Sequence, residues 1–283
     1  MGTSFAEVAP LPGFSREDDS LALRISEWAE SKDNGSLGVD GCLGFAAWSL
    51  GEGLPFPVRV NSAGLIHGNT GEQGERDSSN SPRVYKVKIG MEEVAREQER
   101  LLQFLGEKSG DARLRLDANA ALNMQTTELW LDWMRDRPEI EFLEQPVAVG
   151  MEELLMSEFG SAADRIALDE SVVDNRDFDR MLKMGWPGKI VIKASLFGSP
   201  EPLFSLPRQT KERVIISSAF ETGIGFGYVL KIAGQISTQA QVHGLGTRGF
   251  FADDGLDGWP PSTRYEGTVT EDRLEGVWKN ATS

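Results

Sequence analysis

The chain has 283 residues, of which 40% are hydrophobic and 26% charged, and its formal net charge is −15. This hydrophobic content suffices for a buried core, while the acidic excess argues against binding nucleic acid or an anionic membrane, because both require basic surfaces. One cysteine and two histidines exclude an intrachain disulfide and a Cys/His zinc site. With neither a long apolar run nor a secretory signal, a cytoplasmic protein is expected.

Residues 1–82 are expected to form a region of their own. Apolar side chains recur at helical spacing over 21–28 and 39–50, which predicts two helices that each have one face to bury. Residues 69–83 are polar and rich in glycine and serine, a composition typical of an exposed loop or linker. A boundary between the two parts of the chain is therefore placed after residue 82.

From residue 84 onward, short strand-like runs alternate with helix-like segments. The helical pattern is clearest over 91–105 and 126–136, where apolar residues recur every three or four positions. This alternation predicts βαβ units and a parallel sheet. The strand-like runs cover 84–90, 113–119, 140–146, 165–171, 189–195 and 213–220.

Charged side chains stand at the ends of the first five runs. Lys88, Asp117, Glu144, Asp169 and Lys193 follow one another at intervals of 29, 27, 25 and 24 residues, about one βα unit each. In a β/α barrel the carboxyl ends of the strands surround a single mouth, whereas in an open sheet they spread along a line. The presence of all five groups favours a barrel.

These groups indicate proton-transfer chemistry beside a metal ion. Asp117, Glu144 and Asp169 offer only oxygen ligands, which select a hard cation such as Mg²⁺. Lys86 and Lys88 are two positions apart on one strand and share a face, and facing ammonium groups are expected to lower each other's pKa, which suits a general base. The hypothesis is removal of a proton next to a carboxylate, with the negative charge stabilised by the cations.

The Lys-x-Lys, Asp, Glu, Asp, Lys series resembles the enolase superfamily, and within it the o-succinylbenzoate synthase family. The similarity rests on AEVAPLPGFSRED, YKVKIG, LRLDANAALN, EFLEQP, ALDES, VIKASLFGS and VIISSAFETGIG, and it covers nearly the whole chain. It implies an α/β fold, an enolase-type modified (β/α)7β TIM barrel over 83–283, with a partial α+β capping domain and linker over 1–82. The implied enzyme is a hydro-lyase of menaquinone or phylloquinone biosynthesis, which converts 2-succinyl-6-hydroxy-2,4-cyclohexadiene-1-carboxylate to o-succinylbenzoate.

The resemblance also implies a role for each matching residue. Lys88 would take the α-proton and then protonate the leaving hydroxyl, Lys86 would orient Lys88 and lower its pKa, and Lys193 would stabilise the enediolate. The cofactor would be Mg²⁺, or Mn²⁺ in its place, and the substrate a small-molecule carboxylate, while the oligomeric state is left open. The implied metal ligands are Asp117, Glu144 and Asp169, and the implied substrate-binding residues are Arg115, Asn119, Ser217, Ser218 and Glu221.

The sequence departs from the family at its N-terminus. Members begin with further capping-domain strands and a mobile loop that closes over the site, so this chain is expected to be N-terminally shortened and to lack that loop. Two alternatives follow. One is an N-acylamino acid racemase or dipeptide epimerase on the same scaffold, and the other is a catalytically impaired scaffold without the closing loop.

Overall fold

The computed structural model describes residues 4–16, 20–31, 41–67, 72–73, 83–108, 110–238, 241–248 and 254–282. Most of the predicted linker over 69–83 lies outside these residues. Among the described residues, no helix combines the length and the hydropathy that a membrane-spanning segment needs.

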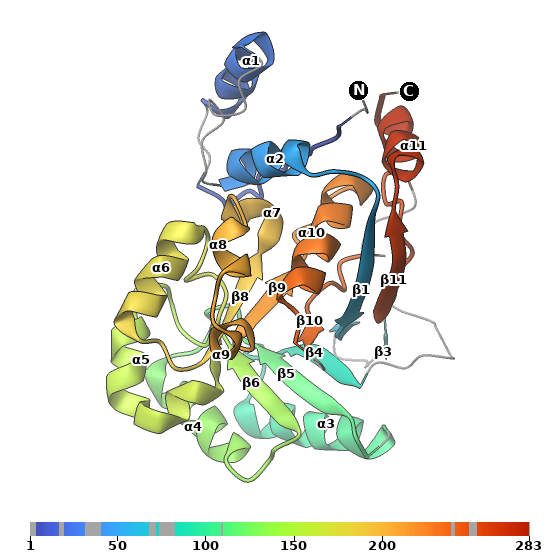
Figure 1. The fold of residues 1–283 in the computed structure, drawn as a ribbon. Coiled ribbons are helices and arrows are strands. Elements are labelled where there is room, and N and C mark those ends of the chain that lie inside the picture. The colour runs from blue at the N-terminus through green and yellow to red at the C-terminus, as the bar shows by residue number, and fades with distance from the viewer. Residues whose placement is uncertain are drawn as a thin grey trace.

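A long, mostly parallel sheet forms the centre of the molecule (Figure 1). Its strands pair in the order β3-β2-β4-β5-β6-β7-β8-β9, and each neighbour after β2 is parallel to the one before. The predicted strand-like runs are confirmed, with ends shifted by a few residues. The strands are β2 (Gly64–His67), β3 (Glu72–Gln73), β4 (Val84–Lys88), β5 (Arg113–Asp117), β6 (Ile140–Glu144), β7 (Ile166–Leu168), β8 (Lys189–Lys193) and β9 (Val214–Ser217).

A short strand, β10 (Val242–His243), brings the two ends of this sheet together. On one side Gly244 forms a parallel bridge with Ser217, at the end of β9. On the other side β10 pairs in parallel with Asn61 and Ser62, directly before β2. The circle of strands is thereby completed as a barrel, as predicted. The sheet includes residues on both sides of position 82, and the domain boundary proposed there stays a prediction.

Helices follow the strands and cover the outside of the barrel (Figure 1). Three short helices stand between β8 and β9 instead of one long one, and Pro207 interrupts the segment between the last two. The helices of this part are α3 (Val94–Glu107), α4 (Met124–Met134), α5 (Glu152–Phe159), the 3₁₀ helix η2 (Gly160–Arg165), α6 (Asn175–Met184), α7 (Ala194–Phe197), α8 (Glu201–Phe204), α9 (Arg208–Lys211) and α10 (Gly223–Ile236).

The two ends of the chain build a second, smaller sheet beside the barrel. In it β1 (Phe56–Ser62) pairs with β10 and, antiparallel, with β11 (Arg264–Val269). The alternating burial of β1 shows that one face of this strand packs inward and the other faces solvent. The remaining helices are α1 (Leu21–Ser31), α2 (Gly41–Gly51) and α11 (Glu271–Thr282).

Side chains fill the barrel in layers. Phe142, Ala167, Val191 and Ile215 form one buried apolar cluster. Each lies two residues before a residue at the carboxyl end of its strand, namely Glu144, Asp169, Lys193 and Ser217. Because side chains of a strand alternate between its two faces, both sets point into the barrel. The apolar layer therefore forms the floor beneath the residues at the carboxyl ends.

Candidate active site

A cavity of about 710 Å³ opens at the carboxyl ends of the barrel strands, and we call it the active cavity. Its wall includes eight of the residues singled out from the sequence, while Glu144 contacts one of them, Lys86. The sheet register places Lys88 beside Asp117, Asp117 beside Glu144 and Lys193 beside Ser217. The eight are Lys86, Lys88, Asp117, Asn119, Asp169, Lys193, Ser217 and Ser218.

Lys86 lies between two carboxylates in this cavity. Its Nζ is 2.7 Å from Oε1 of Glu144 and 2.9 Å from Oδ2 of Asp117. Burial by itself lowers the pKa of Lys86, but the carboxylates of Glu144, Asp117 and Asp169 raise that pKa more, so it lies above its ordinary value. The carboxylates therefore set the pKa of Lys86, whereas the expected lowering of the pKa of one lysine by the other stays a prediction.

The three carboxylates are packed away from solvent and act on one another. Asp117, Glu144 and Asp169 are all buried. Burial, together with the charges of Asp117 and Asp169, raises the pKa of Glu144 to about 8, although Lys86 opposes the shift. The two aspartates thus make ionisation of Glu144 less favourable. A further cation at this place would stabilise all three.

The three carboxylates offer the oxygen ligands that suit a hard divalent cation, although in this structure they pair with lysines. Within the described part of the chain, no group of three or more His, Cys, Asp and Glu side chains is arranged around a common point for a metal. The carboxylates instead accept hydrogen bonds or ion pairs from Lys86 and Lys193. Three buried carboxylates on adjacent strands are still the ligands that Mg²⁺ prefers, and this assignment stays a prediction.

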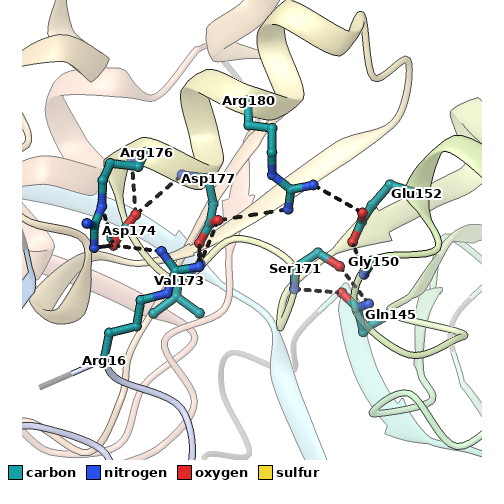
Figure 2. A network of polar contacts seen from close by, with 10 residues as sticks. All are labelled: Arg16, Gln145, Gly150, Glu152, Ser171, Val173, Asp174, Arg176, Asp177 and Arg180. Atoms are coloured by element: carbon teal, nitrogen blue, oxygen red, sulfur yellow. Dashed lines mark hydrogen bonds and ion pairs between the residues drawn. The ribbon is translucent and has the colours of Figure 1, made fainter. Parts of the chain in front are cut away.

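Gln145 holds two of these strand ends together. Its Oε1 accepts a hydrogen bond from the backbone N–H of Asp169 at 3.0 Å. The same oxygen accepts from the backbone N–H of Ser171 at 3.1 Å, and Nε2 of Gln145 donates to Oγ of Ser171 (Figure 2). Gln145 itself has a positive φ of 35°, a conformation that side-chain-bearing residues seldom adopt. The amide therefore fixes the position of Asp169 relative to Glu144. This role of Gln145 was not predicted, although a polar residue directly after the end of a buried strand is the signal for it.

Lys193 stands on the other side of the cavity from Lys86. Its ammonium group pairs with Asp169 and lies 3.7 Å from the centroid of the Phe14 ring. A cation over an aromatic face is held by the quadrupole of the ring. Phe14 was not predicted as a site residue, because nothing in the spacing of the strands points to a segment before the barrel.

Phe14 belongs to an N-terminal strap, which we define as residues 7–16. At one end, Glu7 accepts hydrogen bonds from the N–H groups of Thr222 and Gly225, at 2.9 and 2.8 Å, at the N-terminus of α10. At the other end, Arg16 pairs with Asp174 and Asp177, at 3.1 and 2.8 Å (Figure 2). The middle of the strap lines the active cavity through Leu11, Pro12, Gly13 and Phe14. The strap is thus fastened on both sides of the cavity that it covers.

A polar wall closes the remaining side of the cavity. Ser217 and Ser218 line it, and Thr247 donates a hydrogen bond from its Oγ1 to Oγ of Ser218 at 2.7 Å. Asn119, with φ of 42°, donates from Nδ2 to Oε1 of Glu170 at 3.1 Å. These groups can bind polar parts of a substrate next to the lysines.

Two predicted substrate-binding residues do not line the active cavity. Arg115 lies lower in the barrel, where its Nε donates to Oε2 of Glu141 at 2.7 Å and its Nη2 to the carbonyl oxygen of Val242 at 2.8 Å. Glu221 is buried and accepts hydrogen bonds from Oγ of Ser195 and from N–H of Ala219. Burial raises the pKa of Glu221 despite these hydrogen bonds. Glu221 thus supports the backbone that follows Ser218 rather than forming the cavity wall.

Comparison with known proteins agrees with this arrangement. Residues 73–203 match the family model described as "Enolase C-terminal domain-like". The chain is 30% identical over 270 residues to an o-succinylbenzoate synthase of Thermosynechococcus vestitus, covering 90% of this chain and 81% of that protein. It is 31% identical over 290 residues to the o-succinylbenzoate synthase of Yersinia enterocolitica, covering 98% and 87%.

One solved structure extends the similarity to three dimensions. It is an o-succinylbenzoate synthase of Thermosynechococcus elongatus with magnesium in its active site, and its TM-score with this chain is 0.76 at 27% identity. The superposition covers 98% of this chain and 87% of that protein. The predicted fold class, an enolase-type barrel with a capping part, is confirmed by this likeness and by the strand order described above.

Proposed function

Because the chain belongs to the o-succinylbenzoate synthase family of the enolase superfamily, we propose that it is a lyase that forms o-succinylbenzoate by removing water from 2-succinyl-6-hydroxy-2,4-cyclohexadiene-1-carboxylate. The observation that carries the proposal is the active cavity, where lysines from β4 and β8 face each other across buried carboxylates. The product is an intermediate of menaquinone biosynthesis. The same arrangement supports proton removal next to a carboxylate.

Lys88 is the proposed base. It stands at the end of β4 with an exposed side chain that lines the cavity, so a substrate can reach its amine. The neutral amine takes the proton from the carbon next to the substrate carboxylate, and the resulting ammonium returns that proton to the leaving hydroxyl. One water molecule leaves, and the ring gains its last double bond.

Lys86 and Lys193 supply fixed positive charge. The carboxylates around Lys86 hold its pKa above the ordinary value, so Lys86 stays protonated and can orient the substrate carboxylate next to Lys88. Lys193, held over the ring of Phe14, faces the substrate from the other side and stabilises the negative charge that develops on it.

Asp117, Glu144 and Asp169 are the residues that would hold Mg²⁺. When bound, the cation supplies positive charge for the substrate carboxylate as the proton leaves. The raised pKa of Glu144 supports this proposal, because burial and the neighbouring carboxylates disfavour its charged form, which a bound cation would favour. The proposed substrate is a small carboxylate, and the proposed location is the cytoplasm. The net charge of −15 disfavours nucleic acid and anionic membranes as partners.

A direct assay tests the function. Purified protein is mixed with the cyclohexadiene substrate, with and without Mg²⁺, and formation of o-succinylbenzoate is followed. The wild type should turn over only with Mg²⁺, and Lys88→Ala should remove the activity. Comparable turnover by Lys88→Ala would contradict the proposed base.

A second assay separates this function from the alternative on the same scaffold. N-succinyl amino acids are incubated in deuterated water, and exchange of the α-proton is measured. Exchange without any dehydration of the cyclohexadiene would identify a racemase and overturn the proposed lyase. Absence of both reactions in a folded, Mg²⁺-supplied protein would identify an impaired scaffold.

A further inference from the structure

A second cavity, of about 640 Å³, opens at the opposite, amino-terminal end of the barrel, and we call it the arginine cavity. It is lined by the first residues of several strands, among them Arg113 on β5, Ile140 on β6 and Lys189 on β8. Binding sites of β/α barrels stand at the carboxyl ends of the strands, so this cavity plays no part in the proposed reaction.

The arginine cavity is positively charged in a strongly acidic protein. Five cationic and two anionic side chains line it, an excess of three positive charges, whereas the whole chain carries −15. The cationic residues are Arg113, Arg115, Arg165, Lys189 and Arg208, and the anionic ones are Glu141 and Glu212.

The two carboxylates do not saturate the five cations. The carboxylate of Glu141 is shared, with Oε2 at 2.7 Å from Nε of Arg115 and Oε1 at 3.6 Å from Nη1 of Arg113. Glu212 pairs with Arg208 at 2.9 Å. Lys189 donates to the carbonyl oxygen of Glu212 at 2.9 Å, and a carbonyl group carries no full charge.

Arg165 also lacks a carboxylate partner within the described residues. Its Nη2 donates to the carbonyl oxygens of Arg137 and Ile140, which leaves further N–H groups of the guanidinium for a ligand. Burial and the charges of Arg115 and Arg213 lower the pKa of Lys189, although Glu141 and Glu212 oppose the shift. The positive charges of this cavity therefore destabilise one another, and an anion would relieve that repulsion.

The apolar layer of the barrel separates the two cavities. Phe142 and Ile215 line the arginine cavity from above, and they belong to the buried cluster that forms the floor beneath Glu144 and Ser217. Lys189 and Lys193 stand at opposite ends of the same strand, one in each cavity. A ligand in one cavity is therefore not in contact with a ligand in the other.

We propose that the arginine cavity is a binding site for a small anion of the phosphate class. Guanidinium groups match the geometry of phosphate oxygens with pairs of parallel hydrogen bonds, and here they line a concave site together with Lys189. The apolar residues of the wall, Pro138, Phe142 and Ile215 among them, strengthen each charge interaction by excluding water on one side.

Isothermal titration calorimetry with inorganic phosphate tests this site in the Mg²⁺-supplied full chain, against chloride of the same ionic strength. The wild type should bind one phosphate per chain. Lys189→Met should weaken binding about tenfold, the effect of one charge-assisted hydrogen bond. Lys193→Met is the matched control, because it removes the same charge from the other end of β8, and it should bind phosphate like the wild type.

A second variant covers the case in which Lys189→Met fails to fold. Arg208→Gln changes a side chain that is 79% exposed, and it should weaken phosphate binding without affecting folding. Phosphate binding no stronger than that of chloride, or equal losses in Lys189→Met and Lys193→Met, would overturn the proposal. Tighter binding of malonate than of phosphate would overturn the phosphate class. All these readouts are independent of the dehydration assay.

Discussion

The ammonium nitrogen of Lys86 lies 2.7 Å from Oε1 of Glu144, so β4 and β6 are joined across the end of β5. Both partners are more than three-quarters buried, and the pKa of each lies above its ordinary value. The same ammonium group also lies 2.9 Å from Oδ2 of Asp117, so two buried carboxylates share one lysine. This imbalance at the carboxyl end of the barrel is the basis of the first prediction.

Replacement of Glu144 by Gln should weaken Mg²⁺ binding and lower turnover at least about 100-fold, since even residues that only support metal ligands contribute 10- to 100-fold. Calorimetry with Mg²⁺ and the dehydration assay measure the two effects. Glu128→Gln, an exposed acid on α4, is the matched control and should change neither. An unaltered Mg²⁺ dependence in Glu144→Gln would remove this residue from the metal site.

Phe14→Ala should raise KM for the substrate about tenfold, because the strap loses the ring that covers the cavity and holds Lys193. Folding should change little, because Phe14 is only half-buried. Steady-state kinetics and thermal unfolding separate the two effects. Leu23→Ala, at an apolar residue of α1 that is 60% exposed, should leave KM unchanged. Equal kinetics of both variants would show that the strap does not act on the substrate.

His243 should make the protein less stable in mild acid. Burial and the charge of Arg115 lower the pKa of His243 from 6.5 to about 3, so the folded chain keeps it neutral where the unfolded chain protonates it. In the acid range the unfolded chain therefore binds one more proton than the folded chain. The contribution of His243 to the free energy of unfolding is complete above pH 6.5 and falls as the pH drops toward 3. The loss is up to about 1.4 kcal/mol per pH unit.

Urea unfolding between pH 4 and 8 measures how the free energy of unfolding changes with pH. His243→Gln removes the titrating group and should flatten the curve, although it lowers stability at pH 8 by disturbing the hydrogen bonds of the ring with Ile216 and Ser237. Identical slopes in both proteins would mean that other groups dominate the acid sensitivity.

Gly188→Ala should prevent normal folding of the barrel. A Cβ at this position would lie 2.0 Å from the carbonyl oxygen of Ile166 and 2.8 Å from that of Ala163, and backbone atoms cannot move aside cheaply. The expected loss exceeds about 4 kcal/mol. Gly185→Ala is the control: it has a φ of +78° but open space around it, so it should cost about 1 kcal/mol. Similar melting temperatures for the two variants would contradict this steric account.

The strands and their terminal residues could be predicted because they depend on local rules. Apolar runs bounded by polar residues predict strands, and the spacing from Lys88 to Lys193 follows the length of a βα unit. The pairing of the last strand was not predicted: β11 pairs with β1, near the other end of the chain. Pairing over such a distance depends on tertiary packing, which periodicity does not encode.

The sequence by itself determined which chemical groups meet at the carboxyl end of the barrel, because strand period and parallel topology leave no other place for them. Tertiary structure alone decided their surroundings. It surrounded Lys86 with carboxylates, which raise the pKa of this lysine, and it placed Phe14 over Lys193. It also moved Arg115 to the other end of the barrel, where cations gather around a second cavity. Charge interactions depend on distance through space and on burial, and neither can be read from positions along the chain.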